Sequence, residues 1–411
     1  MDGSNAQIAG NQSLLKRINR MALVRLVKAE PGLSRVELAK RTGLTKTTVG
    51  QLVQELIQEG WLCQIAPSPG QGAGRRPLPL VLDPSRIGLL GAELGVDYLN
   101  VVGCNLQGAI LFSRMVNYQH RDVARTIRCL SELVAEAHSA LAAQKRRTLG
   151  LGVGLPGTVD LLGESLRFAP NIGWRDLPIR KLIETGLRKA GCGGLRASVL
   201  NEANAAVLSE YVFGAENQSG PLVYLSMGIG LGAGIVLRDR LYLGQDGLAG
   251  EVGHNILEKG GPQCSCGRHG CAETFISQRA ISELATGRES PIVAIDELVA
   301  RVEAKDHGTV RAVARAGEYL GVLIENLVNT LNPGAIVFGG PLCRLGEAFV
   351  RPAFRAMHEN GGRYQEQTAS IRMCRFGVNA CAVGAAGSVF QGFLQSLSAS
   401  EALSAPRCRE E

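Results

Sequence analysis

The residues best suited to chemistry in this 411-residue chain are one histidine and three cysteines. His254, Cys264, Cys266 and Cys271 fall within eighteen positions. One imidazole nitrogen and three thiolates form a ligand set that suits structural Zn²⁺. His269 stands inside the same segment as a competing ligand, and three buried thiols beside an unrelated histidine are the alternative. The spacing favours a single tetrahedral metal site.

Two acidic residues bracket this cluster, Glu251 on one side and Glu273 on the other. Either one alone is readily explained as a solvated surface acid. Carboxylates are strong hydrogen-bond acceptors, and these two stand at the two ends of one metal loop. Their placement predicts a polar small-molecule site built against the loop.

Length and composition bound the setting of this site. The chain is longer than one ordinary domain, with 45% hydrophobic and 20% charged residues, as in globular proteins. No apolar run reaches the roughly 18 residues of a membrane span, and residues 1–11 lack the apolar core of a signal peptide. Most of the eleven cysteines stand alone in apolar segments, which favours reduced thiols. We therefore expect a cytoplasmic protein with no membrane insertion.

All of the excess positive charge lies near the N-terminus. The net charge is +7, and residues 11–82 hold eleven Lys or Arg against four Glu, while the remainder is balanced. A solvated basic face would account for this. The asymmetry also predicts a phosphate-binding module attached to a neutral body.

Three helices are expected in this basic segment, at residues 12–28, 34–42 and 45–57. The second opens with Ser34 and Glu37, which form a capping box. The third buries an apolar stripe, and its other face carries short polar side chains and a lysine, which suit contacts in the DNA major groove. A helix-turn-helix is predicted over an ordinary three-helix bundle. Its predicted DNA contacts are Thr45, Lys46, Thr47, Thr48 and Gln51.

A wing is expected to follow these helices. Residues 61–65 and 78–82 are strand-like, and the Gly/Pro-rich stretch between them carries Arg75 and Arg76. An extended arginine pair can enter a narrow, electronegative minor groove. A flexible linker is the alternative for this stretch.

From residue 83 onwards, strand-like runs alternate with helical ones, which indicates an α/β body. Three hairpin-like strands begin at residue 87, and three more begin at residue 222. We infer an internal duplication into two lobes with a ligand-binding cleft between them. One continuous helix is expected at residues 273–286, and another at 380–395 closes the chain.

Four motifs stand out in the body of the chain: GEVGH at 250–254 with CSCGRHGCAE at 264–273, NEANAA at 201–206, LSMGIGLGAGIV at 225–236 and NPGAIVFGG at 332–340. Together these motifs resemble the ROK family, which contains repressors, uncharacterised reading frames and sugar kinases. The resemblance spans about residues 87–390, and the winged helix adds the repressor branch; segments 93–98 and 201–204 look most like its xylose-repressor members. The fold it implies is an N-terminal winged helix-turn-helix followed by a two-lobed, actin-like α/β domain of the sugar kinase type, with a structural zinc loop.

The resemblance also implies residue roles. It selects His254 over His269 as the fourth zinc ligand, beside Cys264, Cys266 and Cys271. It implies that Glu251, His254 and Glu273 hold sugar hydroxyls. Four further positions match residues that contact or line the sugar in the family: Asn201, Glu202, Asn171 and Gly157.

Two departures from the kinase pattern argue against catalysis. A ROK kinase has Asp-x-Gly-Gly-Thr in its first hairpin, whereas this chain has Val96 in place of the second glycine and Asp97 in place of the threonine. A branched side chain and a negative charge there disfavour a triphosphate. Glu202 replaces the catalytic aspartate and reaches one methylene further. We expect no enzymatic activity.

The expected function is a sugar-responsive transcriptional regulator, a repressor of carbohydrate genes that leaves its operator when a monosaccharide enters the cleft. The expected partners are operator DNA, a sugar effector and a second copy, in a homodimer or a dimer of dimers. A residual sugar kinase with a DNA-binding arm, and a regulator controlled by a protein such as a sugar transporter, are the alternatives. The expected parts are residues 1–82 (head), 83–200 with 380–395 (first lobe), 201–379 with the zinc loop 254–271 (second lobe) and 396–411 (tail).

Overall fold

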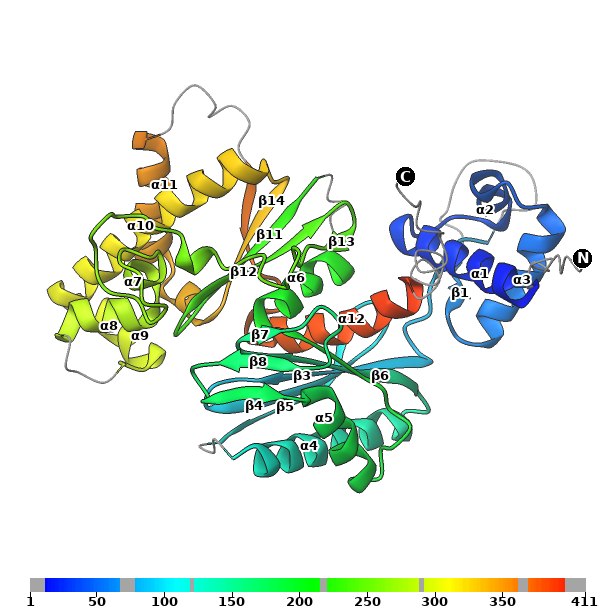
Figure 1. Cartoon of the computed structure of the whole chain (residues 1–411). Coiled ribbons are helices and arrows are strands. Elements are labelled where there is room, and N and C mark those ends of the chain that lie inside the picture. Colours follow the sequence, from blue (N-terminus) through cyan, green and yellow to red (C-terminus); the bar gives the residue numbers. More distant parts are fainter. Residues whose placement is uncertain are drawn as a thin grey trace, which may run out of the picture.

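The computed structural model describes residues 12–66, 78–118, 122–214, 220–287, 292–360 and 369–395. A small N-terminal head stands beside a body made of two lobes (Figure 1). The expected wing tip with Arg75 and Arg76, and the expected tail at 396–411, lie outside the described residues.

The head (residues 12–66 and 78–82) contains the three predicted helices, α1 (Gln12–Ala29), α2 (Arg35–Thr42) and α3 (Lys46–Gln58). Ser34 and Glu37 form the predicted capping box at the start of α2. Strands β1 (Leu62–Gln64) and β2 (Leu80–Leu82) then pair antiparallel. The helix-turn-helix and the base of its wing are confirmed.

Each lobe is built on a five-stranded sheet with the same strand order. The first has the order β5-β4-β3-β6-β10 and the second β13-β12-β11-β14-β15. In both, three antiparallel strands continue into two parallel ones. This shared order confirms the internal duplication. The first sheet contains β3 (Ile87–Leu94), β4 (Tyr98–Cys104), β5 (Ile110–Asn117), β6 (Arg147–Leu155) and β10 (Ala197–Asn201); the second contains β11 (Leu222–Met227), β12 (Leu231–Leu237), β13 (Arg240–Leu241), β14 (Ala335–Gly339) and β15 (Ser370–Met373).

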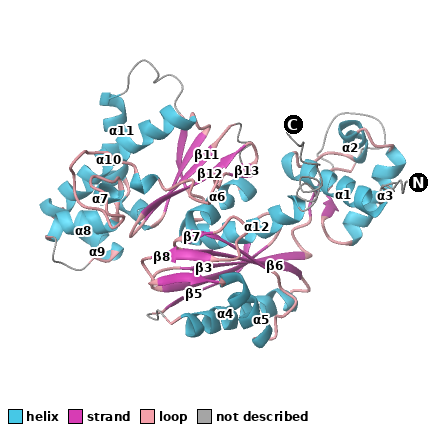
Figure 2. Ribbon diagram, viewed as in Figure 1, coloured by secondary structure: helices cyan, strands magenta, loops and turns pink. Residues whose placement is uncertain are grey.

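Two helices, α6 (Glu202–Phe213) and α12 (Ala380–Gln395), pack together between the sheets (Figures 1 and 2). α6 contacts the second sheet, and α12 contacts the first. A Cβ on Gly384 would lie 1.8 Å from the carbonyl oxygen of Ala205, so only glycine allows this approach. α12 has the length and apolarity of a membrane span, but here these properties serve its burial between a helix and a sheet.

The outer faces are covered by the remaining helices. α4 (Val123–Ala143) and α5 (Ile179–Lys189) pack together, with α4 on the first sheet, while helices of the second lobe form a core with the second sheet. The helix expected at 273–286 is wrong as one piece: Ser277 is extended and caps a new helix through Ala280, dividing α7 (Glu273–Ile276) from α8 (Gln278–Thr286). The other helices of the second lobe are α9 (Ile295–Glu303), α10 (His307–Leu331) and α11 (Glu347–Asn360).

A three-stranded sheet in the first lobe was missed from the sequence. It consists of β7 (Thr158–Val159), β8 (Leu166–Ala169) and β9 (Trp174–Leu177) in that order. Its strands have two to four residues, too few to show an alternating pattern.

Candidate functional site: a metal loop in the second lobe

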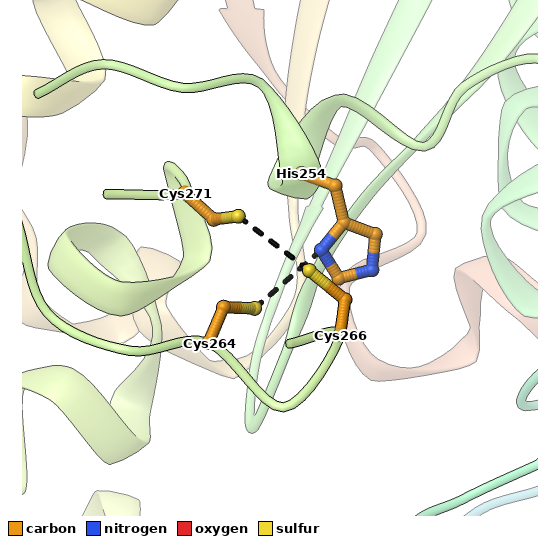
Figure 3. Close-up of side chains that lie close together, drawn as sticks. All are labelled: His254, Cys264, Cys266 and Cys271. Carbon is orange, nitrogen blue, oxygen red and sulfur yellow. Dashed lines mark hydrogen bonds between the residues drawn. The ribbon is translucent and has the colours of Figure 1, made fainter. Parts of the chain in front are cut away.

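The four predicted ligands meet in the second lobe. His254 ends a short 3₁₀ turn, Val252–His254, and the loop that follows brings the three cysteines close to its ring (Figure 3). The ligand atoms all lie within 4.8 Å of one another. His269 is exposed and lies against the carbonyl of Gly261 instead.

The spacing of these atoms fits tetrahedral zinc. Zn–S bonds of about 2.3 Å and Zn–N bonds of about 2.0–2.1 Å separate two sulfurs by roughly 3.8 Å, and a sulfur from a nitrogen by roughly 3.6 Å. Cys266 Sγ lies 3.7 Å from Cys271 Sγ, and Cys264 Sγ lies 3.6 Å from His254 Nδ1. The donor set and its geometry can therefore hold a metal ion.

Local backbone geometry forms this loop. The amide of Cys264 donates to the carbonyl of Arg268 at 2.8 Å, which closes the turn that carries Cys266. Gly270 has a φ of 76°, and a Cβ there would lie 1.7 Å from the carbonyl oxygen of Glu258. Burial acts to raise the pKa of Cys266, but hydrogen bonds from Arg268 and the neighbouring thiols lower it to about 6. Cys266 thus favours its thiolate, whereas burial and the neighbouring thiols raise the pKa of Cys271 to about 12.

Glu251 lies beside the second ring nitrogen of His254. Its Oε2 is 3.8 Å from His254 Nε2, while Nδ1 faces the sulfurs. A carboxylate behind a metal-bound imidazole fixes the orientation of the ring. Burial raises the pKa of Glu251, the charge of His254 opposes this, and the charge of Glu273 adds to it. The charge of Glu273 therefore acts on Glu251 from the other end of the loop.

Glu273 is held by the second glycine-rich turn. Its Oε2 accepts the backbone N–H of Leu231 at 3.1 Å, and Gly230 lies so close that a Cβ there would be 2.8 Å from this oxygen. The glycine at 230 therefore makes room for the carboxylate. This contact joins the metal loop to the β11–β12 hairpin.

The start of α6 lies where the two lobes join. Asn201 caps this helix, because its Oδ1 accepts the amide of Ala203 at 2.9 Å, and its Nδ2 donates to the carbonyl of Gly157, also at 2.9 Å. Burial and the charge of Glu251 raise the pKa of Glu202 to about 7. The charge of Glu251 thus reaches the start of α6. Asn171 is exposed on the turn between β8 and β9.

A tyrosine fills the first hairpin, where the kinase pattern has its phosphate loop. The Tyr98 ring lies against Gly95, where an added Cβ would be 2.5 Å from ring atom Cε1, and its hydroxyl donates to the carboxylate of Glu93. Burial raises the pKa of Glu93 to about 8, although the Tyr98 hydrogen bond lowers it. This pair was not predicted from the sequence, where its signal is the aromatic residue directly after the Val96–Asp97 turn.

The recognition face of the head is open. Lys46, Thr47 and Gln51 are exposed at the start of α3, while the opposite stripe is buried. The Thr45 hydroxyl accepts the amide of Thr48 at 3.1 Å, and the two hydroxyls lie 2.8 Å apart. These two threonines therefore serve the helix start as well as its exposed surface.

The fold and site define a class: a winged helix-turn-helix head on a two-lobed body of the sugar kinase type, with a Cys/His loop in the second lobe. The chain belongs to the ROK family, whose sequence profile matches residues 89–391, and a winged helix-turn-helix DNA-binding profile matches residues 16–62.

Three relatives place it further. The chain is 30% identical over 399 residues to a xylose repressor of Caldicellulosiruptor bescii, covering 94% of this chain and 98% of that one. A ROK family transcriptional regulator, a homologue of the E. coli MLC protein, superposes with a TM-score of 0.76 at 25% identity over 95% of this chain and 100% of its own. A ROK glucokinase from Streptomyces griseus, in complex with glucose and AMPPNP, superposes at 0.63 and 25% identity over 74% of this chain and 100% of its own.

Proposed function

We propose that this chain is a sugar-responsive transcriptional repressor that binds a monosaccharide without phosphorylating it. The observation that supports the proposal is the combination of an intact head with a first hairpin in which the Tyr98 ring lies against Gly95, where the kinase pattern has its phosphate loop. A repressor needs the first and is unaffected by the second. A kinase needs phosphate donors at that hairpin.

The sugar site in this proposal lies between the lobes. Glu251, Glu273 and His254 face it from the metal loop, and Glu202 faces it from the start of α6. Asn201, Gly157 and Asn171 complete the candidate set, with Asn201 acting through its bond to the Gly157 loop. D-xylose is the first sugar to test, because the C. bescii relative is a xylose repressor.

Zn²⁺ is the metal we propose for His254, Cys264, Cys266 and Cys271. When bound, it supplies a closed four-ligand site that stabilises the loop. The chain's own residues then do the rest: the loop holds the imidazole toward Glu251, and the Glu273 carboxylate is fixed on the β11–β12 turn. The proposed role is to orient sugar-binding groups.

In the proposed mechanism, the protein is a cytoplasmic homodimer, or a dimer of dimers, whose heads occupy two half-sites of an operator. The head ends at residue 82, the first lobe comprises 83–200 with 380–395, and the second comprises 201–379. Thr45, Lys46, Thr47, Thr48 and Gln51 contact DNA, with Arg75 and Arg76 in the minor groove. Sugar must bind the DNA-incompetent arrangement more tightly, because equal affinity for both would shift nothing.

The test is a titration of an operator complex with sugars. The duplex is the sequence that the full chain enriches from a random library, and the panel begins with D-xylose. We expect the sugar to weaken operator binding at least tenfold, and the Glu251→Ala variant to lose this response while binding the duplex normally. A panel in which no sugar changes operator affinity contradicts the proposal.

A sugar kinase with a DNA-binding arm is the second candidate, because a ROK glucokinase shares the fold. Sugar-dependent ADP release, measured with the same preparation and panel, separates the two. The proposal expects no turnover above the sugar-free background. Turnover that Tyr98→Ala increases would favour the kinase and identify Tyr98 as a partial block.

A further inference from the structure

The two central helices both contact the head near their C-terminal ends. α6 begins at Glu202, one of the candidate sugar residues, and carries Tyr211 in its last turn. α12 begins beside Asn379, which accepts a hydrogen bond from Asn100 of the first hairpin. At 1.5 Å per residue these helices span roughly 18 Å and 24 Å. The C-terminal end of α12 lies against the head (Figure 1).

The end of α12 provides the first anchor for the head. Trp61, after α3, is buried and stacks on Phe390 with ring centroids 6.3 Å apart, and its ring lies 5.2 Å from that of Phe393. Arg25 of α1 donates to the carbonyl of Leu394 at 2.8 Å. Apolar stacking and a charged hydrogen bond therefore fix one side of the head to this helix.

A second anchor lies on α6 and the second lobe. The Lys28 ammonium of α1 stands 5.7 Å from the centroid of the Tyr211 ring, and the Tyr211 hydroxyl donates to the carbonyl of Asp239 at 3.2 Å. Burial lowers the pKa of Lys28, and the charge of Asp239 acts in the opposite direction. The lysine therefore senses the β12–β13 turn as well as the ring.

That turn is conformationally unusual. Arg238 and Asp239 form a two-residue hairpin loop between β12 and β13, with φ of 49° and 62°. Positive φ at both positions is the geometry of a type I′ turn, which favours Gly, Asn and Asp. Arg238 is outside this set and carries backbone strain, and the turn presents its Asp239 carbonyl to Tyr211.

The two anchors rest on different lobes. α12 is seated on the first sheet, where a Cβ on Gly91 or Gly152 would lie 1.8 Å from the carbonyl oxygen of Ala382 or Ala385. The β12–β13 turn belongs to the second sheet. A movement of one lobe against the other therefore cannot preserve both anchors unless the head adjusts.

We infer that the head is clamped across both lobes, and that the contact of Lys28 with Tyr211 and the Asp239 turn transmits lobe movement to the DNA-binding surface. The inference rests on the proposed function for its regulatory meaning. The Lys28 ammonium already stands near the roughly 6 Å limit of a cation–π contact. A relative shift of about 1 Å would therefore release it, while the stacked anchor at Trp61 remains.

The experiment uses the full chain with Lys28→Met, which keeps the length of the side chain without its charge, and Tyr211→Leu, which removes the ring. Lys40→Met is the matched control, because it removes a charge from an exposed position on α2. Two quantities are measured. The first is hydrogen exchange of the α1 segment around Lys28 without ligands, and the second is the ratio of operator dissociation constants with and without D-xylose.

In both test variants we expect at least fivefold faster exchange at the end of α1, and a ratio that falls at least fivefold toward one with the D-xylose Kd within twofold of wild type. The control should change neither. Unchanged exchange in both variants overturns the clamp. Faster exchange with a wild-type ratio overturns the transmission step. If no sugar of the panel alters operator binding by the wild type, the proposed function fails, and unchanged or faster exchange then separately refutes or supports the clamp.

Discussion

Replacing Glu93 with glutamine tests whether the Glu93 carboxyl in the first hairpin is protonated in the folded chain. Glu93 is 7% exposed, and burial raises its pKa to about 8. An unfolded glutamate ionises near pH 4.3, so the folded chain keeps a proton that the unfolded chain has lost. Stability associated with this group is fully present below about pH 4 and is lost as the pH rises toward 8.

The size of the effect follows from the shift. Each pKa unit corresponds to about 1.4 kcal/mol, so between pH 5 and pH 8 the wild type should lose roughly 3 kcal/mol through this residue. The amide introduced by Glu93→Gln does not titrate, and its carbonyl oxygen can still accept the Tyr98 hydroxyl. The free energy of unfolding of Glu93→Gln should therefore gain roughly 3 kcal/mol on the wild type across this range.

The assay is urea unfolding of both proteins at pH 5, 6, 7 and 8. Groups that titrate in both chains cancel in the difference. Glu132→Gln, at an exposed position of α4, is the control, and its difference from the wild type should stay within about 0.5 kcal/mol at every pH. If the free energies of unfolding of Glu93→Gln and the wild type change in parallel with pH, the Glu93 carboxyl is not protonated in the folded chain, and the reasoning is refuted.

Three further predictions concern the metal, a buried ion pair and the recognition helix. Metal analysis should find one zinc per chain. Cys271→Ser should lose this zinc and bind D-xylose at least tenfold more weakly, whereas the control Cys129→Ser should keep both properties. Full zinc content in Cys271→Ser would be contrary evidence. Arg372→Met should destabilise the chain by about 3–5 kcal/mol, because Arg372 pairs with the Glu210 carboxylate, which is 1% exposed; a loss below about 1 kcal/mol in urea unfolding would show that the pair is dispensable. Gln51→Ala should cost about 1–3 kcal/mol of binding free energy on the selected duplex but little on random DNA. Lys46→Ala should weaken binding to both and lower the slope of log affinity against log salt concentration by roughly one. Equal losses of affinity on both duplexes would show that Gln51 does not contact bases.

Local patterns carried much of the fold. The capping box at Ser34 and the polar face of α3 predicted the head, because both depend on residues within a few positions of each other. The repeated triplets of strands predicted two lobes, and the identical strand order of the two sheets confirms the duplication. The break at Ser277 was not predictable from periodicity, because apolar spacing continues through it while the backbone turns extended.

The site divides in the same way. The metal ligands were predictable because their spacing lies within one loop. The Asn201 bond to Gly157 depends on a tertiary contact that no local pattern encodes. The head anchors pair Trp61 with the end of α12 and Lys28 with the end of α6, and the partners are more than 180 positions apart in the sequence. These contacts are visible only in the three-dimensional structure.

The central claim is that sugar and operator DNA oppose each other through one protein. Thermodynamic linkage makes this coupling reciprocal, so the most direct measurement is the D-xylose dissociation constant of the full chain, free and saturated with the selected duplex. We expect the duplex to weaken sugar binding at least tenfold, by the same factor by which the sugar weakens operator binding. An equal sugar affinity in the two states would contradict it.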